Sequence, residues 1–253
     1  AFNLDMLSSD FQFIIHRFNC LESTNSYALQ QLHAKKVVNG GVFWSLEQLK
    51  GQGQRGENWQ SDKGKNLLFS VVAGVNLRVE MQFYLSKAVA LALYYFIDSL
   101  SVANASIKWP NDLLVAGQKI AGILIQNSIQ GSKIQHAVIG IGLNVNQTVF
   151  EKYKRKATSL KLIKGEEFDL EELLQQFLPF LSEQLVELQK GNFKKINQNY
   201  LNHLYGFQSL MQFKDKEGAF SGQIIGIAES GHLQVSKSGE VKEYDLKELE
   251  FCF

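Results

Sequence analysis

Cysteine, proline and long hydrophobic runs are all scarce in this chain. Only two cysteines, Cys20 and Cys252, and two prolines occur among its 253 residues. This excludes a disulfide-stapled scaffold and fits a reducing compartment. The longest strongly apolar run, 88–97, covers ten residues, whereas about 20 are needed to span a bilayer. The first residues also lack the basic and then apolar pattern of a secretion signal. We therefore predict a cytoplasmic protein with no membrane partner.

Charge of one sign is not in excess either. Lysine and arginine total 26, aspartate and glutamate total 25, and the formal net charge is +1. A general nucleic-acid binder usually carries a clear basic excess, so DNA is not an expected partner. The five histidines and two cysteines show no spacing typical of metal ligands, and we predict neither a zinc site nor a cysteine nucleophile. Hydrophobic residues make up 45% of the chain, which is enough to build a sizeable core.

Hydrophobic patterning predicts an α+β fold, in which a mixed and largely antiparallel sheet packs against helices. Three successive strands joined by short turns indicate an antiparallel meander and not a parallel doubly wound sheet. The polar and basic segment 148–164 is interpreted as an exposed surface loop. We expect strands at 11–20, 41–47, 66–74, 106–115 (with a bend at Pro110), 119–129 and 133–146, and helices at 27–36, 79–100, 169–190 and 192–205.

A second, smaller domain is predicted after residue 205. From Phe207 on, short alternating runs are separated by turns that contain glycine, a pattern typical of a compact β-barrel. This domain, 206–253, holds 5 lysines and 8 acidic residues, a net charge of −3, so domain 1–205 carries +4. The basic side therefore belongs to the larger domain, where we expect the chemistry.

A glycine-rich loop contains Gly51, Gly53 and Gly56 and a single arginine, Arg55. Glycines let a backbone approach a ligand closely and direct N–H groups at an anion, and arginine suits phosphate or carboxylate. The spacing does not match a P-loop, and no helical pattern follows it, as a dinucleotide-binding turn would require. Taken alone, this segment is best interpreted as a flexible surface loop.

The segment Lys-Trp-Pro-Asn-Asp at 108–112 gathers a cation, an amide and a carboxylate around a rigid proline. If these groups converge, Lys108 and Asn111 can bind phosphate and Asp112 can hold Mg²⁺. The alternative is an ordinary strand bend with surface charges, and the segment by itself favours neither.

Two later strands carry polar groups at apolar positions. Lys119 enters an apolar strand, where its ammonium must either extend to water or meet an anionic ligand. Asn144 and Asn146 alternate in another strand, so their side chains point the same way and need hydrogen-bonding partners.

Together these clusters resemble one family, the biotin protein ligases, also called biotin–[acetyl-CoA-carboxylase] ligases. Its five motifs occur in family order: Ser-Thr-Asn at 23–25, the glycine-rich loop ending in tryptophan at 51–59, Lys-Trp-Pro-Asn-Asp at 108–112, Lys-x-Ala-Gly-Ile-Leu at 119–124, and Gly-Ile-Gly-x-Asn-x-Asn at 140–146. The resemblance implies a class II synthetase-like catalytic domain with a small C-terminal β-barrel. It also implies a homodimer formed through the antiparallel sheet.

The resemblance implies a reaction in two steps. The carboxylate of biotin attacks the α-phosphate of ATP and gives biotinyl-5′-AMP and pyrophosphate. A lysine of the biotin carboxyl carrier protein then attacks the mixed anhydride. The expected small molecules are biotin, ATP and Mg²⁺, and the expected macromolecular partner is the carrier protein.

The resemblance also implies roles for individual residues. Lys119, Arg55 and Lys108 are expected to be catalytic, and Asp112 to hold Mg²⁺. Biotin is expected to contact Ser23, Thr24, Asn25, Gln48, Gly51, Gln52, Gly53, Gln54, Lys119 and Gly122, and ATP to contact Arg55, Trp59, Lys108, Asn111 and Asn144. Ser23 or Thr24 can also cap the helix that follows, and Trp109 is expected to pack in the core.

Gln52 and Gln54 stand where the family usually carries arginine. This departure motivates one alternative, a non-catalytic protein that binds biotin or biotinyl-adenylate, which the intact Lys119 opposes. A lipoate-type ligase shares the architecture, but the ordered motifs are those of the biotin branch. A DNA-binding repressor is opposed by the 22 residues that precede Ser23, which are too few for a DNA-binding domain.

Overall fold

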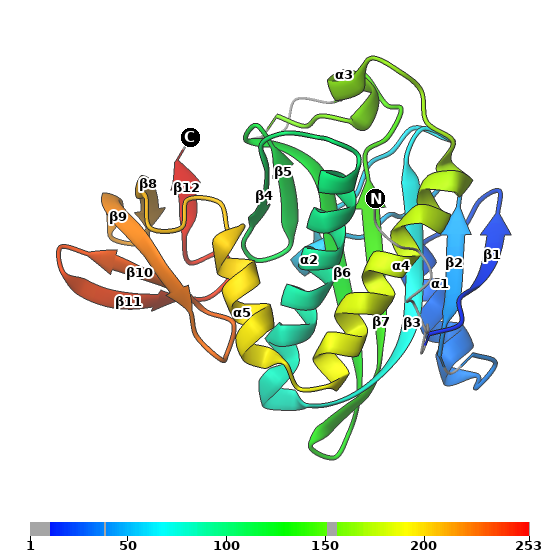
Figure 1. Cartoon of the computed structure of the whole chain (residues 1–253), viewed down its shortest axis with the longest axis horizontal. Helices are drawn as coiled ribbons and strands as arrows, with labels where there is room; N and C mark the ends of the chain where they lie inside the picture. Colours follow the sequence, from blue (N-terminus) through cyan, green and yellow to red (C-terminus); the bar gives the residue numbers. More distant parts are fainter. Residues whose placement is uncertain (1–10, 38, 151–155, 253) are drawn as a thin grey trace.

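The computed structural model describes residues 11–37, 39–150 and 156–252, except for the side chain of Arg55. Its larger part is built on a seven-stranded sheet in the order β1-β2-β3-β7-β6-β5-β4, which Figure 1 shows. Only β1 and β2 pair in parallel, and all other neighbours are antiparallel. The predicted mixed, largely antiparallel sheet is therefore confirmed. The strands are β1 (Ile14–Phe18), β2 (Gly41–Ser45), β3 (Leu67–Arg78), β4 (Ala105–Lys108), β5 (Asp112–Val115), β6 (Gln118–Gln130) and β7 (Lys133–Leu143).

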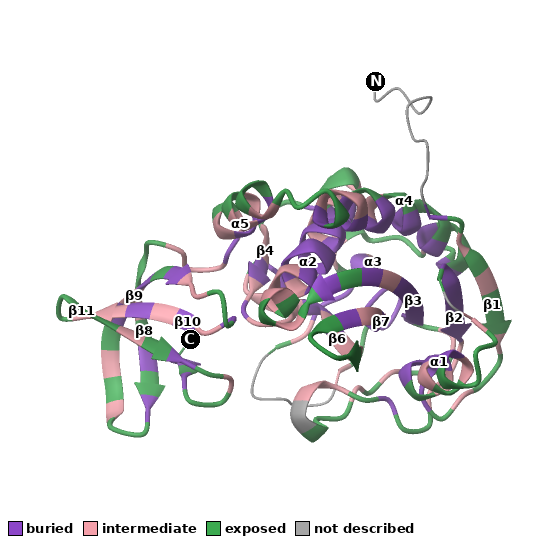
Figure 2. Ribbon diagram, turned by 90° about the horizontal axis from the view of Figure 1, so that it is seen from below, coloured by how far each residue is buried: buried purple, intermediate pink, exposed green. Residues whose placement is uncertain are grey.

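Helices cover both faces of this sheet (Figure 2). On one face α2 (Gln82–Ser99) packs against α4 (Leu170–Gln189) and α5 (Phe193–Asn202), and α1 (Thr24–His33) lies on the other face against β2, β3 and β7. The central strands β3 and β7 are buried between these layers, which explains their nearly continuous apolar sequences. Short 3₁₀ turns form η2 (Gln54–Gly56) and η3 (Val79–Met81). No helix among the described residues is long and apolar enough to cross a membrane.

The segment 106–115 forms two strands where one bent strand was expected. β4 and β5 pair antiparallel with Lys108 opposite Asp112, and the Trp109–Pro110 peptide bond between them is cis. Proline has no N–H for a strand ladder and fixes its own φ angle, so the chain reverses at this point. The meander consequently has four strands, β4 to β7, and the reversal brings Lys108 and Asp112 side by side.

The segment 148–164 is not an exposed loop throughout. Residues 151–155 lie outside the described part of the chain, but 158–160 are buried, and the backbone on either side of Ala157 hydrogen-bonds to the backbone of Lys119. Ser159 then caps the short helix α3 (Leu160–Lys164). The polar sequence did not indicate this arrangement, because the hydrogen bonds to Lys119 are made by backbone groups and not by side chains.

The C-terminal part forms a separate antiparallel sheet in the order β11-β10-β9-β8-β12. It coils around an aromatic core, in which Phe213 contacts Phe220 and Phe251 at ring-centroid distances of 5.7 and 5.3 Å. This matches the predicted small β-barrel, with β11 and β12 as the edge strands of the described sheet. The expected boundary after residue 205 falls between α5 and β8. The strands are β8 (Leu210–Asp215), β9 (Gly218–Ile227), β10 (Leu233–Lys237), β11 (Glu240–Tyr244) and β12 (Glu250–Cys252).

Candidate functional site

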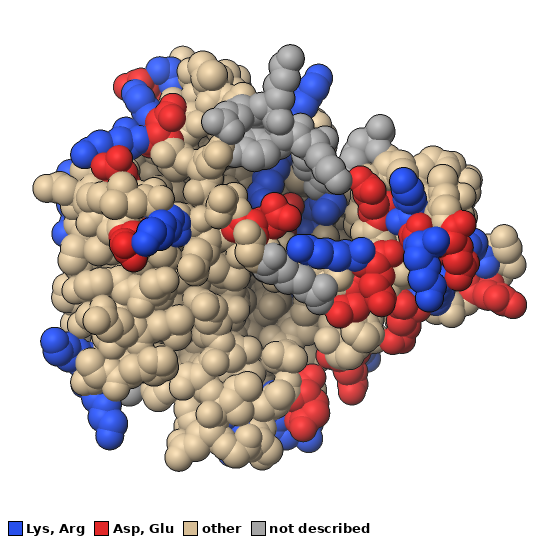
Figure 3. Space-filling view, turned by 180° about the vertical axis from the view of Figure 1, so that it is seen from behind, with Lys and Arg blue, Asp and Glu red and all other residues tan. Residues whose placement is uncertain are grey.

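A cavity of about 310 Å³ lies on the α1 side of the large sheet and reaches the C-terminal module. Viewed from behind, basic and acidic side chains meet in a hollow beside that module (Figure 3). All five sequence clusters supply its walls, so folding brings together segments that are more than 100 residues apart. The expected site residues that line it are Ser23, Thr24, Asn25, Gln48, Gln52, Gly53, Gln54, Trp59, Lys108, Asn111, Asp112, Lys119 and Gly122.

The start of α1 forms a buried polar pocket at one end of the cavity. The Thr24 hydroxyl and backbone N–H both donate to Gln48 Oε1, at 3.0 and 2.7 Å. The Ser70 hydroxyl lies 2.6 Å from Asn25 Oδ1. Ser23 both lines the cavity and accepts from the Ser26 N–H as the helix N-cap, so the capping and the ligand-binding interpretations are compatible.

Two glycines of β7 make room for side chains that form the cavity. A Cβ at Gly140 would overlap the amide of Asn25, with Cγ at 2.7 Å, and a Cβ at Gly142 would overlap the Trp59 ring, with Cζ2 at 2.7 Å. A Cβ at Gly122 on β6 would meet the same ring, with Cζ3 at 2.9 Å. The glycines of these motifs therefore serve close approach of the Asn25 and Trp59 side chains to the sheet.

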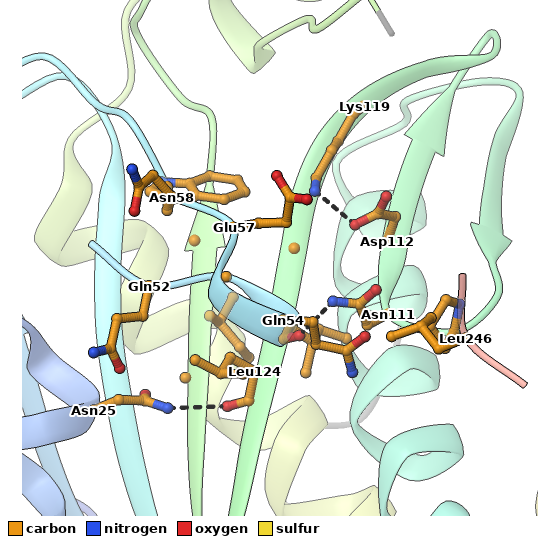
Figure 4. Close-up of a pocket in the computed structure, with 18 of the residues that line it drawn as sticks. Asn25, Gln52, Gln54, Glu57, Asn58, Asn111, Asp112, Lys119, Leu124 and Leu246 are labelled. Atoms are coloured by element: carbon orange, nitrogen blue, oxygen red, sulfur yellow. Dashed lines mark hydrogen bonds and ion pairs between the residues drawn. The ribbon is translucent and has the colours of Figure 1, made fainter. Parts of the chain in front are cut away.

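Lys119 projects from β6 into the middle of the cavity. Its Nζ lies 2.7 Å from Asp112 Oδ1 and 5.4 Å from the centre of the Trp59 ring. Figure 4 shows Glu57 and Asp112 on either side of this ammonium, with Asn25 toward one end of the cavity and Leu246 toward the other. The two carboxylates hold this ammonium in place. Together they carry one more negative charge than Lys119 neutralises, and a second cation can neutralise the remainder.

The glycine-rich loop folds over the cavity as η2, held by a hydrogen bond from the Gly53 N–H to the Glu57 carbonyl at 2.6 Å. It is therefore a wall of the site and not a free surface loop. The side chain of Arg55 lies outside the described residues, so its expected role stays a prediction. Gly51 does not line the cavity, and its backbone pairs with that of Trp59 instead.

The hairpin at 108–112 closes the other end. The Asn111 amide donates to the Ile123 carbonyl at 2.8 Å, which leaves its oxygen for other contacts, and the Lys108 ammonium lies 4.6 Å from the Phe251 ring centre. Trp109 is 3% exposed and its indole N–H donates to the Gly231 carbonyl at 2.8 Å. Its expected role in packing is confirmed, and it ties the hairpin to the C-terminal module.

Asn144 does not line the cavity, although ATP contact was expected of it. The side chain is 4% exposed, and its amide donates to the carbonyls of Thr158 and Lys119, at 3.0 and 3.5 Å. Asn146 likewise binds the backbone of Phe168. Both asparagines have the hydrogen-bonding partners that buried polar groups need. These partners are backbone groups of the protein.

The sequence analysis missed several residues of the cavity. Glu57 and Asn58 lie in the recognised loop, but the sequence analysis gave neither of them a role. Leu246, Lys247 and Leu249 come from the C-terminal module, and no motif marks them. Only the docking of that module brings a further cation, Lys247, to the Lys108 end.

Comparison with known proteins identifies the family. Residues 17–144 match the model of the biotin/lipoate A/B protein ligase family. The chain is 31% identical over 228 residues to a biotin–[acetyl-CoA-carboxylase] ligase of Paracoccus denitrificans, covering 84% of this chain and 90% of that protein. It is 26% identical over 233 residues to the bifunctional ligase/repressor BirA of Bacillus subtilis, covering 91% and 71%.

Solved structures agree with this assignment. The biotin protein ligase of Aquifex aeolicus in complex with biotin and ATP superimposes with a TM-score of 0.78 at 25% identity, covering 96% of this chain and all of that one. The chain therefore belongs to the biotin/lipoate A/B protein ligase family and, within it, to the biotin protein ligases.

Proposed function

We propose that this chain activates biotin with ATP and transfers it to a lysine of a biotin carboxyl carrier domain. The observation that carries the proposal is the position of Lys119, whose ammonium lies in the same cavity as the polar pocket of α1 and is held against Asp112 of the 108–112 hairpin. The two groups that must meet, a carboxylate and an α-phosphate, are both anions. A fixed ammonium between them lowers their repulsion and stabilises the charge of the transition state.

The polar pocket suits the ureido ring of biotin, which carries two N–H donors and one carbonyl acceptor. Ser23, Thr24, Asn25 and Gln48 offer both kinds of group within a buried region. Trp59, which was expected to contact ATP, lines the cavity and packs its ring over Gly122 and Gly142. We assign it to the ring system of biotin, and its buried Nε1, which has no partner in the described structure, is a donor for this ligand.

The opposite end of the cavity suits the triphosphate of MgATP. Lys108 and Lys247 line it, and Arg55 stands on the loop above. No group of three or more metal-binding side chains converges within the described residues. However, Mg²⁺ bound to phosphates needs only one or two carboxylates in addition, which Asp112 and Glu57 can supply. The ion would then neutralise the charge that these two carboxylates leave beside Lys119.

The second step consumes the acceptor lysine of the carrier. Its amine nitrogen forms an amide bond with the carbonyl carbon of biotinyl-5′-AMP, and the bond from that carbon to the phosphate oxygen breaks. AMP leaves with the electron pair. A lysine that starts as an ammonium releases two protons to water, one before the attack and one as the amide forms.

Pyrophosphate release from MgATP tests the proposal, measured with biotin and with lipoate, each with and without an apo carrier domain. We expect release that depends on biotin and label on the carrier lysine. Biotin binding without release would instead support the non-catalytic binding protein, and release with lipoate alone would support the other branch of the family.

A further inference from the structure

A second cavity of about 210 Å³ adjoins the first. The two share Gln54 and Asn111 as part of their common wall, and Figure 4 shows these side chains next to each other. The second cavity extends from this wall between β6 and the beginning of α2. None of the roles assigned above makes use of it.

Two residues that line this space carry buried acceptor atoms without donors. Asn127 Oδ1 and Gln54 Oε1 are inaccessible to solvent and have no hydrogen-bond partner in the described structure, and both residues line the second cavity. Buried polar atoms without partners are rare and each calls for an explanation. Two such acceptors in one small space suit a ligand that donates hydrogen bonds.

The rest of the wall is suited to an apolar chain. Phe83 and Ile125 line the cavity together with the proline of the hairpin. Of the described residues that line it, none carries a charge. The lack of a cation in this lining disfavours an anionic ligand. A four-carbon chain that ends in an amine matches both features, because lysine nitrogen offers donors and its stem is apolar.

We propose that the second cavity receives the acceptor lysine of the carrier and leads its amine past Gln54 and Asn111 to the acyl phosphate. The inference rests on the proposed function and adds to it the route of the second substrate. The first turn of α2, which begins at Gln82, also lies at this cavity. Its positive dipole end disfavours an ammonium and so favours the neutral amine, which is the attacking form.

The test separates the two steps of the reaction in Asn127→Leu, which keeps the side-chain size and removes the acceptor. We expect the kcat/KM for an apo biotin carboxyl carrier domain to fall about tenfold or more, as for the loss of one buried hydrogen bond. Single-turnover formation of biotinyl-adenylate, followed as one pyrophosphate per site, should stay within about twofold of the wild type.

A second variant and a matched control complete the design. Ser86→Phe fills the cavity from α2 and keeps both acceptor residues, and it should slow transfer in the same selective way. Gln130→Leu removes an amide from the exposed end of the same strand, β6, and should leave both steps unchanged.

Three results would overturn the inference. Transfer by Asn127→Leu equal to that of Gln130→Leu would mean that the cavity holds only water. Equal losses in both steps would assign Asn127 to the shape of the first cavity. Wild-type enzyme without biotin-dependent pyrophosphate release would refute the proposed function itself, and the inference with it.

Discussion

Gly140→Ala is the sharpest probe of the polar pocket. A Cβ at this position overlaps the amide of Asn25, and the obstacle is severe because Asn25 is only 4% exposed. The added methyl projects from the centre of the sheet, where β7 is paired on both sides. The strand cannot move away, so the asparagine must.

The magnitude follows from the bonds that Asn25 would lose. Its oxygen lies 2.6 Å from the Ser70 hydroxyl, and its amide donates to the Leu124 carbonyl at 3.2 Å and to Gln126 Oε1 at 3.0 Å. Three such bonds are worth about 2–4 kcal/mol in total. We expect the free energy of unfolding to fall by about 2 kcal/mol and the Kd for biotin to rise about tenfold or more.

Calorimetric titration with biotin and urea denaturation measure these two quantities. Gly74→Ala is the matched control, since a Cβ there meets its nearest atoms at 3.8 Å, in ordinary contact. Biotin affinity that is equal in the two variants, despite a loss of stability in Gly140→Ala, would remove Asn25 from the biotin site. Equal stability as well would refute the packing argument.

Three other substitutions test the electrostatics of the protein. Lys119→Gln should slow biotinyl-adenylate formation by about 100- to 1000-fold, the usual effect of losing one preorganised donor; a loss below about tenfold in single-turnover kinetics would contradict its central role. Burial lowers the pKa of Lys87 to about 8, so the folded state bears a cost at pH 7 that disappears as pH rises from about 8 to 10.5. Lys87→Met should therefore raise the free energy of unfolding at pH 7 by up to about 3 kcal/mol, less what the surrounding rings contribute. This gain should vanish by pH 10.5 in urea titrations, and a gain independent of pH would refute the explanation. Desolvation raises the pKa of Asp215, but hydrogen bonds from the Glu217 N–H, Tyr244 and Lys242 outweigh it and lower the pKa to about 2. Wild-type protein should thus lose stability as pH falls from about 4 to 2, and Asp215→Asn should show a shallower loss of thermal stability over that range.

Local chemistry made part of this protein readable from its sequence. The helix expected from residue 169 on is capped by Asp169, whose side chain accepts from the Glu172 N–H; such a cap depends only on residues within one turn. The antiparallel order of the last strands of the large sheet followed from their short connections. The motifs also named most of the residues that line the first cavity, since each motif sets its side chains within a few positions of each other.

Packing between distant segments decided the rest. Glu57 and Lys247 became part of the site only when a loop and the C-terminal module closed on the sheet. The Asn144 amide donates to the Thr158 carbonyl and does not line the cavity. The oxygen of Asn127 is unpaired because no donor from another described element reaches it. A strand sequence shows that a polar group must find a partner, but the partner comes from elements that pack beside it, and only the tertiary structure determines whether that partner is protein or is left for a ligand.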